Sequence, residues 1–200
     1  MFYKINSTKL QLFSDLIRLN KPTGVFLLVW PCWLALVYIQ NYELESVRWY
    51  LYFIIGAFLM RSAGCIINDI IDIDFDQKVT RTKIRPLASK RISIAEAFLL
   101  LIVLLVISFF ILLEFNFKSI VLGLVSIPFV ILYPFMKRIT FFPQLFLGII
   151  FSWGVLIVSM QFNVQITFDF VLLYFACIFW TLAYDTVYAY QDKEDDILNK

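Results

Sequence analysis

Histidine is absent from this 200-residue chain, and charged residues make up only 16% of it. Without histidine, the chain has no imidazole base, no Ser-His-Asp triad and no histidine-ligated metal site. Its 3 cysteines are scattered through apolar stretches, which excludes a disulfide framework and a zinc site. The formal net charge is only +2, so the chain also lacks the electrostatic footprint of a nucleic-acid-binding protein.

Apolar residues, in contrast, are abundant. They make up 62% of the chain, and the mean hydropathy is +0.84, whereas soluble domains contain roughly 45–50% apolar residues. A soluble chain of this size has too little interior to bury so many apolar side chains. The composition therefore predicts an integral membrane protein.

Gaps between charged residues mark six candidate membrane helices, since about 20 apolar residues cross the hydrocarbon core. The stretches are 22–42, 49–68, 97–113, 119–136, 139–168 and 170–191. The fifth stretch is long enough for a span and a loop, while the second and sixth each contain one charge, Arg61 and Asp185. The sequence thus predicts an all-α bundle of about six transmembrane helices in a single domain, 1–200.

The distribution of basic residues predicts the orientation of the bundle. Fourteen of the 17 lysines and arginines fall before the first span, between spans 2 and 3, between spans 4 and 5, or after span 6. The opposite side has only Arg48 and Lys118. Because cytoplasmic loops carry an excess of basic residues, these four segments and both chain termini are predicted to be cytoplasmic.

Nine of the 15 acidic residues occur in two short clusters, which lie at the predicted cytoplasmic ends of spans 2 and 6. At 100° per residue, several members of each cluster share one face of their helix. These members are Asn68, Asp72 and Asp76 in the first cluster and Asp185, Asp192 and Asp196 in the second. Each helix end is therefore expected to present a stripe of carboxylates.

Such stripes require a cation. Two carboxylates about 6 Å apart repel each other by roughly 3 kcal/mol at an effective dielectric constant near 20. The negative end of the helix dipole adds to that cost. Oxygen ligands without histidine or cysteine favour a hard ion, Mg²⁺ or Ca²⁺. The alternative interpretation is that each acidic cluster is a solvated loop. A loop explains a single cluster well, but it explains poorly two clusters that both have helical spacing and both lie on the same predicted side of the membrane.

Basic side chains near the acidic clusters indicate a ligand that carries phosphates. Arg61 lies inside a span, where an ionisable group is a functional hypothesis by default. Arg81 and Arg85 follow the first cluster, and Lys137 and Arg138 occupy the next cytoplasmic loop. Mg²⁺ often binds through carboxylates together with substrate phosphates, and arginine and lysine bind phosphate directly. Pairing with an aspartate is the alternative for Arg61, and positive-inside orientation is the alternative for the loop residues.

At these residues the chain resembles the UbiA-type intramembrane prenyltransferases. Their first signature, NDxxDxxxD, corresponds to Asn68–Asp76, and their second is similar to Asp185–Asp196. Both motifs occur in order at predicted helix ends, which makes the resemblance specific. Further stretches, Arg18–Gly24, Leu28–Pro31 and Tyr133–Arg138, resemble the branch that prenylates 4-hydroxybenzoate.

The resemblance implies a Mg²⁺-dependent transfer of a polyprenyl group from polyprenyl diphosphate to the ring carbon ortho to the hydroxyl of 4-hydroxybenzoate. This is a membrane step of ubiquinone biosynthesis, in the bacterial inner membrane or the mitochondrial inner membrane. The family fold has nine helices, so the chain is expected to lack the last of them. Other acceptors of the haem, naphthoate or chlorophyllide type, a non-catalytic membrane fragment and a cation transporter remain as alternatives.

The resemblance also implies roles for individual residues. Asp72 and Asp192 are expected to be catalytic. The expected metal ligands are Asn68, Asp72, Asp76, Asp192 and Asp196, and the expected diphosphate ligands are Arg61, Arg81, Lys137 and Arg138. Asp69, Asp185 and Tyr188 are expected to support this site.

Overall fold

The computed structural model describes residues 8–39 and 47–198, except for the side chains of 137–138 and 189–198. Within these residues the chain forms helices and no strand. The helices are α1 (Lys9–Leu16), α2 (Thr23–Ile39), α3 (Val47–Ile71), α4 (Ile73–Asp76), α5 (Ile94–Leu112), α6 (Phe117–Ile139), α7 (Pro143–Phe151), α8 (Trp153–Gln161) and α9 (Phe168–Leu198).

The described helices account for all six predicted spans. Five segments are long and apolar enough to cross a membrane, namely α3, α5, α6, α7 together with α8, and α9. Helix α2 is a shorter apolar helix of 17 residues. The long fifth stretch of the sequence forms α7 and α8, which are separated at Ser152, with loops at both ends. The predicted all-α membrane bundle is therefore confirmed.

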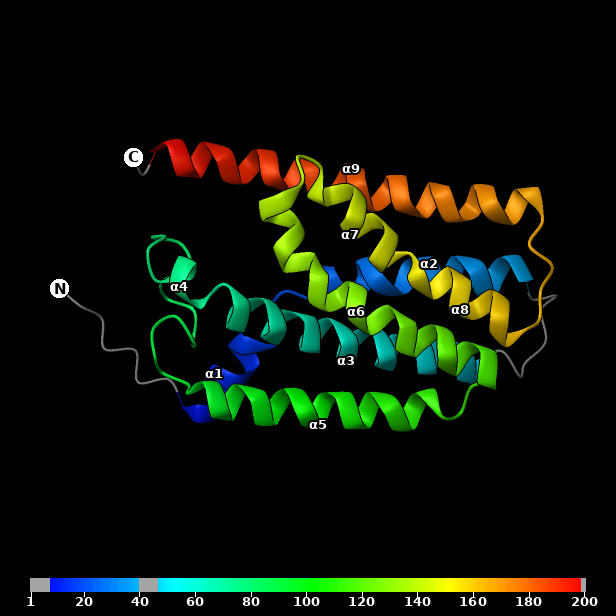
Figure 1. Cartoon of the computed structure of the whole chain (residues 1–200), viewed down its shortest axis with the longest axis horizontal. Helices are drawn as coiled ribbons and strands as arrows, with labels where there is room; N and C mark the ends of the chain where they lie inside the picture. Colours follow the sequence, from blue (N-terminus) through cyan, green and yellow to red (C-terminus); the bar gives the residue numbers. More distant parts are fainter. Residues whose placement is uncertain (1–7, 40–46, 199–200) are drawn as a thin grey trace.

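The long helices lie side by side along the long axis of the molecule (Figure 1). Helix α3 packs chiefly against α5 and α2, helix α7 against α9, and helix α8 against α2 and α6. The short helices α1 and α4, the loop 77–93 and the last turns of α9 all lie at one end of the bundle (Figure 1). Several of the basic segments thus share an end, and the assignment of that end to the cytoplasm stays a prediction.

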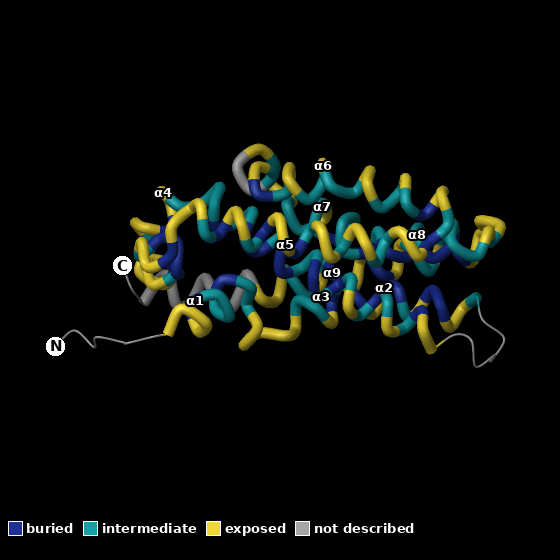
Figure 2. Tube along the Cα trace, turned by 90° about the horizontal axis from the view of Figure 1, so that it is seen from below, coloured by how far each residue is buried: buried dark blue, intermediate teal, exposed yellow. Residues whose placement is uncertain are grey.

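Two apolar clusters lie inside the bundle. The first joins α2, α3, α8 and α9 and includes Val29, Phe53, Val155 and Phe170. The second joins α1, α3, α5 and the loop 77–93 and includes Leu16, Ile66, Leu87 and Leu104. Many residues on the outer faces of α5 and α6 are exposed (Figure 2), and most of these side chains are apolar. Apolar outer faces suit contact with lipid chains.

Three prolines lie within the spanning helices, Pro31 in α2 and Pro128 and Pro134 in α6. Proline has no backbone N–H and its ring crowds the preceding turn, so it bends a helix. Helix α6 changes direction in its second half (Figure 1), toward α7. The bend places the residues around Tyr133 beside the cavity described next.

Candidate active site

A cavity of about 2120 Å³ lies between α2, α3, α5, α6, α7, α8 and α9. Its polar lining includes Asn68, Arg81 and Asp185. Its apolar lining includes Phe53 and Phe115, which belong to the first apolar cluster of the bundle. The cavity therefore joins a charged mouth to an apolar interior.

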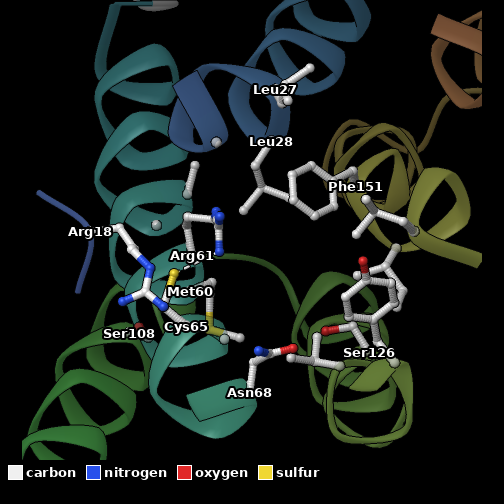
Figure 3. A pocket seen from close by; sticks show the side chains of 18 of the residues that line it. Arg18, Leu27, Leu28, Met60, Arg61, Cys65, Asn68, Ser108, Ser126 and Phe151 are labelled. Atoms are coloured by element: carbon white, nitrogen blue, oxygen red, sulfur yellow. Dashed lines mark hydrogen bonds between the residues drawn. The ribbon is translucent and has the colours of Figure 1, made fainter. Parts of the chain in front are cut away.

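Helix α3 supplies one polar side of the cavity. Arg61, Cys65 and Asn68 follow each other at helical spacing, and all three line the cavity. Figure 3 shows them on one side of the cavity, with Leu28 of α2 and Phe151 of α7 across from them. The Arg61 Nη1 donates a hydrogen bond to the Cys65 Sγ over 2.7 Å. Arg61 is thus a half-buried cation inside a span, as the sequence predicts.

The Arg61 guanidinium also packs against the first turn of α2. Gly24 lies there, and a Cβ atom added to it would come within 3.0 Å of both Cζ and Nη2 of Arg61. No other residue type fits at this position without moving the arginine. Gly24 therefore helps to define where the guanidinium lies.

An ion-pair cluster of four residues joins the first acidic motif to two other segments. The Asp69 Oδ1 accepts hydrogen bonds from Nη2 of Arg18 at 2.6 Å and from Nη1 of Arg85 at 3.3 Å. The same Arg85 nitrogen donates to Oδ2 of Asp76 at 2.6 Å. Asp69 and Asp76 are only 1% and 3% exposed, so the two arginines neutralise carboxylates that are buried.

The helix is interrupted in the middle of this motif. Helix α3 ends at Ile71, and Asp72 has φ −94° and ψ 9° before α4 begins at Ile73. The Asp72 amide still donates to the Asn68 carbonyl, and the Asp76 amide to the Asp72 carbonyl. Asn68 lines the cavity, and the Asp76 side chain bonds Arg85, which lines the same cavity. The proposed metal-binding roles of these residues stay predictions.

Part of the second motif reaches the same cavity. Asp185 and Tyr188 line it, and Tyr188 stacks on Tyr184 with ring centroids 5.9 Å apart. Asn68 of the first motif lines the same cavity, so residues of both motifs meet there.

Four predicted site residues lie outside the described side chains. They are Lys137, Arg138, Asp192 and Asp196, whose backbones belong to α6 and α9. Among the side chains that are described, no three acidic or cysteine groups lie close enough together to hold a metal ion.

The donor chemistry of the described residues suits a hard divalent cation. Asn68 and Asp185, whose side chains carry oxygen donors, line the cavity, and Oδ2 of Asp69 is buried without a hydrogen-bond partner. Carboxylate and amide oxygens are preferred ligands of Mg²⁺ and Ca²⁺. Cys65, the one thiol on the same face of α3, is already engaged with Arg61.

Residues 28–200 match the UbiA prenyltransferase family. The chain belongs to this family. Members of it generally use a divalent metal. The UbiA chain is therefore a multi-pass membrane protein, in agreement with its apolar helices.

Curated relatives of this UbiA chain have closely similar sequences. A protein of Dictyostelium discoideum named "4-hydroxybenzoate polyprenyltransferase, mitochondrial" is 45% identical, over 94% of this chain and 41% of that protein. A protein of Shewanella sp. (strain ANA-3) named "4-hydroxybenzoate octaprenyltransferase" is 42% identical, over 94% of this chain and 66% of that protein. The chain thus spans between two fifths and two thirds of the length of these relatives.

A solved structure shares the fold of this UbiA chain. The apo structure of a UbiA homolog from Aeropyrum pernix K1 matches 85% of this chain and 64% of that chain, with a TM-score of 0.69 and 24% sequence identity. The fold expected from the two acidic motifs is therefore confirmed.

Sequence reasoning grouped Arg85 with the cations that could bind phosphate, but it assigned no role to Arg18 or Gly24. Arg18 and Gly24 both lie in the stretch that resembles the 4-hydroxybenzoate branch, and Arg85 follows the first acidic cluster. The signal in the sequence was the position of Arg85 after the first acidic motif and of Arg18 and Gly24 in a stretch that resembles the family. Their partners, Asp69 and Arg61, depend on how distant segments fold together.

Proposed function

We propose that this chain carries out Mg²⁺-dependent transfer of a polyprenyl group from polyprenyl diphosphate to 4-hydroxybenzoate, at the ring carbon ortho to the hydroxyl. The observation that carries the proposal is the continuity of the cavity, from a mouth with basic and acidic side chains to an apolar interior. An amphiphilic donor fits this arrangement, since its diphosphate needs cations and its isoprenoid chain needs apolar surroundings. The names of relatives at 42% and 45% identity favour 4-hydroxybenzoate over the other acceptors.

The diphosphate would lie at the mouth of the cavity. Arg61 and Arg81 border it there and can each give paired hydrogen bonds to phosphate oxygens. Lys137 and Arg138, near the end of α6, are proposed to complete this cationic group.

The metal ligands are proposed to come from both acidic motifs. Asn68, Asp72 and Asp76 would hold Mg²⁺ on one side, and Asp192 and Asp196 on the other. When bound, Mg²⁺ supplies electrostatic stabilisation of the diphosphate leaving group. Asp185 and Tyr188 line the cavity one to two turns before Asp192 and are placed to support this pocket.

The reaction begins when the bond between the allylic carbon and the diphosphate oxygen breaks, and the electron pair leaves with the diphosphate. Arg61 and Arg81 stabilise the growing negative charge. The ring carbon of the acceptor then forms the new bond to the allylic cation, and loss of the ring proton restores aromaticity. Asp192 is proposed to polarise the phenol or take that proton. The apolar walls formed by Phe53 and Phe115 exclude water, which would otherwise capture the cation.

The biological setting belongs to the same proposal. The reaction is a membrane step of ubiquinone biosynthesis, in the bacterial or mitochondrial inner membrane, with the cavity mouth facing the cytoplasm or matrix. Two observations support this setting, the excess of basic residues in the segments on one side and the mitochondrial and bacterial relatives.

The test uses the 200-residue chain in lipid nanodiscs with a polyprenyl diphosphate and isotope-labelled 4-hydroxybenzoate. We expect a prenylated product with Mg²⁺ and none after chelation, and Asp192→Asn should abolish it. Asp74→Asn is the matched control, because Asp74 is an exposed neighbour of the first motif and should leave the rate unchanged. Transfer to a dihydroxynaphthoate and not to 4-hydroxybenzoate would refute the acceptor, and product without divalent metal would refute the mechanism.

A further inference from the structure

Asp69 lies beside the proposed metal ligands, yet its contacts are with two arginines. One carboxylate oxygen accepts from both Arg18, at 2.6 Å, and Arg85, at 3.3 Å. Arg18 follows α1, and Arg85 belongs to the loop 77–93, so Asp69 joins two segments that are distant in sequence. A carboxylate that is 1% exposed is stable in ionised form only when such partners are present.

The loop 77–93 is held against the bundle by further contacts. Leu87 and Ile92 are buried in the second apolar cluster. The Thr82 hydroxyl donates to the Asp76 carbonyl oxygen over 3.1 Å, and Thr82 is itself buried. Arg81, the neighbour of Thr82, lines the cavity. The position of Arg81 at the cavity mouth therefore depends on how firmly this loop is attached.

The charges within the ion-pair cluster balance. Asp69 and Asp76 contribute two negative charges, and Arg18 and Arg85 contribute two positive charges. Arg85 is shared, because one of its nitrogens reaches both aspartates. Removal of the Asp69 charge leaves Arg18 without its carboxylate partner and leaves Arg85 with Asp76 alone.

We propose that Asp69 is a positioning residue, which acts through Arg18 and Arg85 to hold the loop 77–93 and the segment after α1 against the end of α3. It thereby sets the positions of Arg81 at the cavity mouth and of Asn68 and Asp72 beside it. The proposed attachment of the loop is argued from the ion pairs alone. The proposed effect on the Mg²⁺ dependence of prenyl transfer also rests on the proposed function.

The first test measures loop attachment by limited trypsin digestion of the intact chain in nanodiscs. Asp69→Asn keeps the shape of the side chain and removes its charge. Cleavage within 77–93 should become about tenfold faster, since proteolysis follows the population of the open loop. Glu96→Gln is the matched control, because it removes the ion pair of Glu96 with the exposed Lys9. Glutamine preserves the helix cap that Glu96 forms with Ser93, so the loop should be cleaved at the wild-type rate.

A second variant covers the case in which Asp69→Asn fails to insert. Arg85→Lys keeps the charge, but its side chain ends one atom short of Nη1, the nitrogen that reaches both aspartates, so both ion pairs are weakened. Faster cleavage of the loop in either variant supports the proposal. Wild-type cleavage rates in both Asp69→Asn and Arg85→Lys would overturn it.

The second test separates a positioning residue from a metal ligand. For Asp69→Asn, the Mg²⁺ concentration at half-maximal transfer should rise about tenfold, and excess Mg²⁺ should restore most of kcat, because the ligands remain but are held less firmly. For Asp72→Asn, turnover should be lost at every Mg²⁺ concentration. If Asp69→Asn also loses turnover at all concentrations, the positioning role is refuted. If the wild-type chain transfers no prenyl group, the proposed function fails, and the trypsin result still decides the attachment of the loop.

Discussion

Gly24→Ala is the sharpest single test of the proposed diphosphate site, because it moves one functional group without changing its chemistry. The new methyl group would lie 3.0 Å from Cζ and Nη2 of Arg61, and closer still to Nε. Ordinary contact begins at 3.4 Å, so the guanidinium carbon must retreat by at least 0.4 Å and Nε by about 1 Å. The guanidinium is the far end of a flexible side chain, so the arginine is expected to move while the helices stay in place.

The expected loss of activity follows from that displacement. A misplacement of about 1 Å at a binding group can lower the rate by about 100-fold. That factor corresponds to about 2.7 kcal/mol of transition-state stabilisation. Stability should not fall for reasons of helix propensity, because alanine is a better helix former than glycine.

The assay compares kcat/KM for prenyl transfer with the thermal unfolding temperature of the same preparations. Gly56→Ala is the matched control, since an added Cβ there meets no atom within 4 Å. We expect Gly24→Ala to lose activity at unchanged Tm and Gly56→Ala to remain within about twofold of wild type. Wild-type kcat/KM for Gly24→Ala, or an equal loss for Gly56→Ala, would refute the argument that Gly24 positions Arg61.

Two further predictions concern packing. Gly148→Ala should destabilise the protein by about 1–3 kcal/mol in thermal or denaturant unfolding, because its Cβ would lie 2.8 Å from the Ile178 carbonyl oxygen of α9. Gly64→Ala, whose Cβ would meet Val130 at 3.9 Å, should have little effect, and equal losses in the two variants would contradict the close contact of α7 with α9. The thiols of Cys32, Cys65 and Cys177 should react with maleimide only after unfolding, because all three residues are at most 5% exposed. Rapid labelling of the folded protein, measured by mass spectrometry, would contradict that burial.

The bundle could be predicted from the sequence because lipid imposes simple rules. A spanning helix needs a long apolar run, and the gaps between charges reveal such runs directly. Within the described residues, these gaps did not reveal two local breaks in the helices. Ser152 divides the fifth span into α7 and α8, and Asp72 separates α3 from α4. Neither position contains a proline or glycine, so no local signal marked these breaks.

The candidate site could be predicted only in part. Helical periodicity grouped Asn68 and Asp185 each with neighbours on its own helix, and both residues line one cavity. Periodicity gives no information about partners on other segments. The pairing of Asp69 with Arg18 spans 51 residues, and the contact of Gly24 with Arg61 joins two different helices. Such contacts arise from tertiary packing, which a single sequence does not display.

The prolines of α2 and α6 have a consequence for the chemistry of the cavity wall. A proline cannot donate to the carbonyl four residues earlier, so Pro31, Pro128 and Pro134 leave three carbonyl oxygens without their usual helical donor. Those oxygens belong to Leu27, Leu124 and Val130, and all three residues line the cavity. Peptide oxygens carry partial negative charge, so each proline leaves an electron-rich carbonyl without its helical donor at a residue of the cavity wall. In the proposed reaction, a short-lived carbocation between its leaving group and an aromatic ring would be more stable beside such atoms than beside alkyl groups alone.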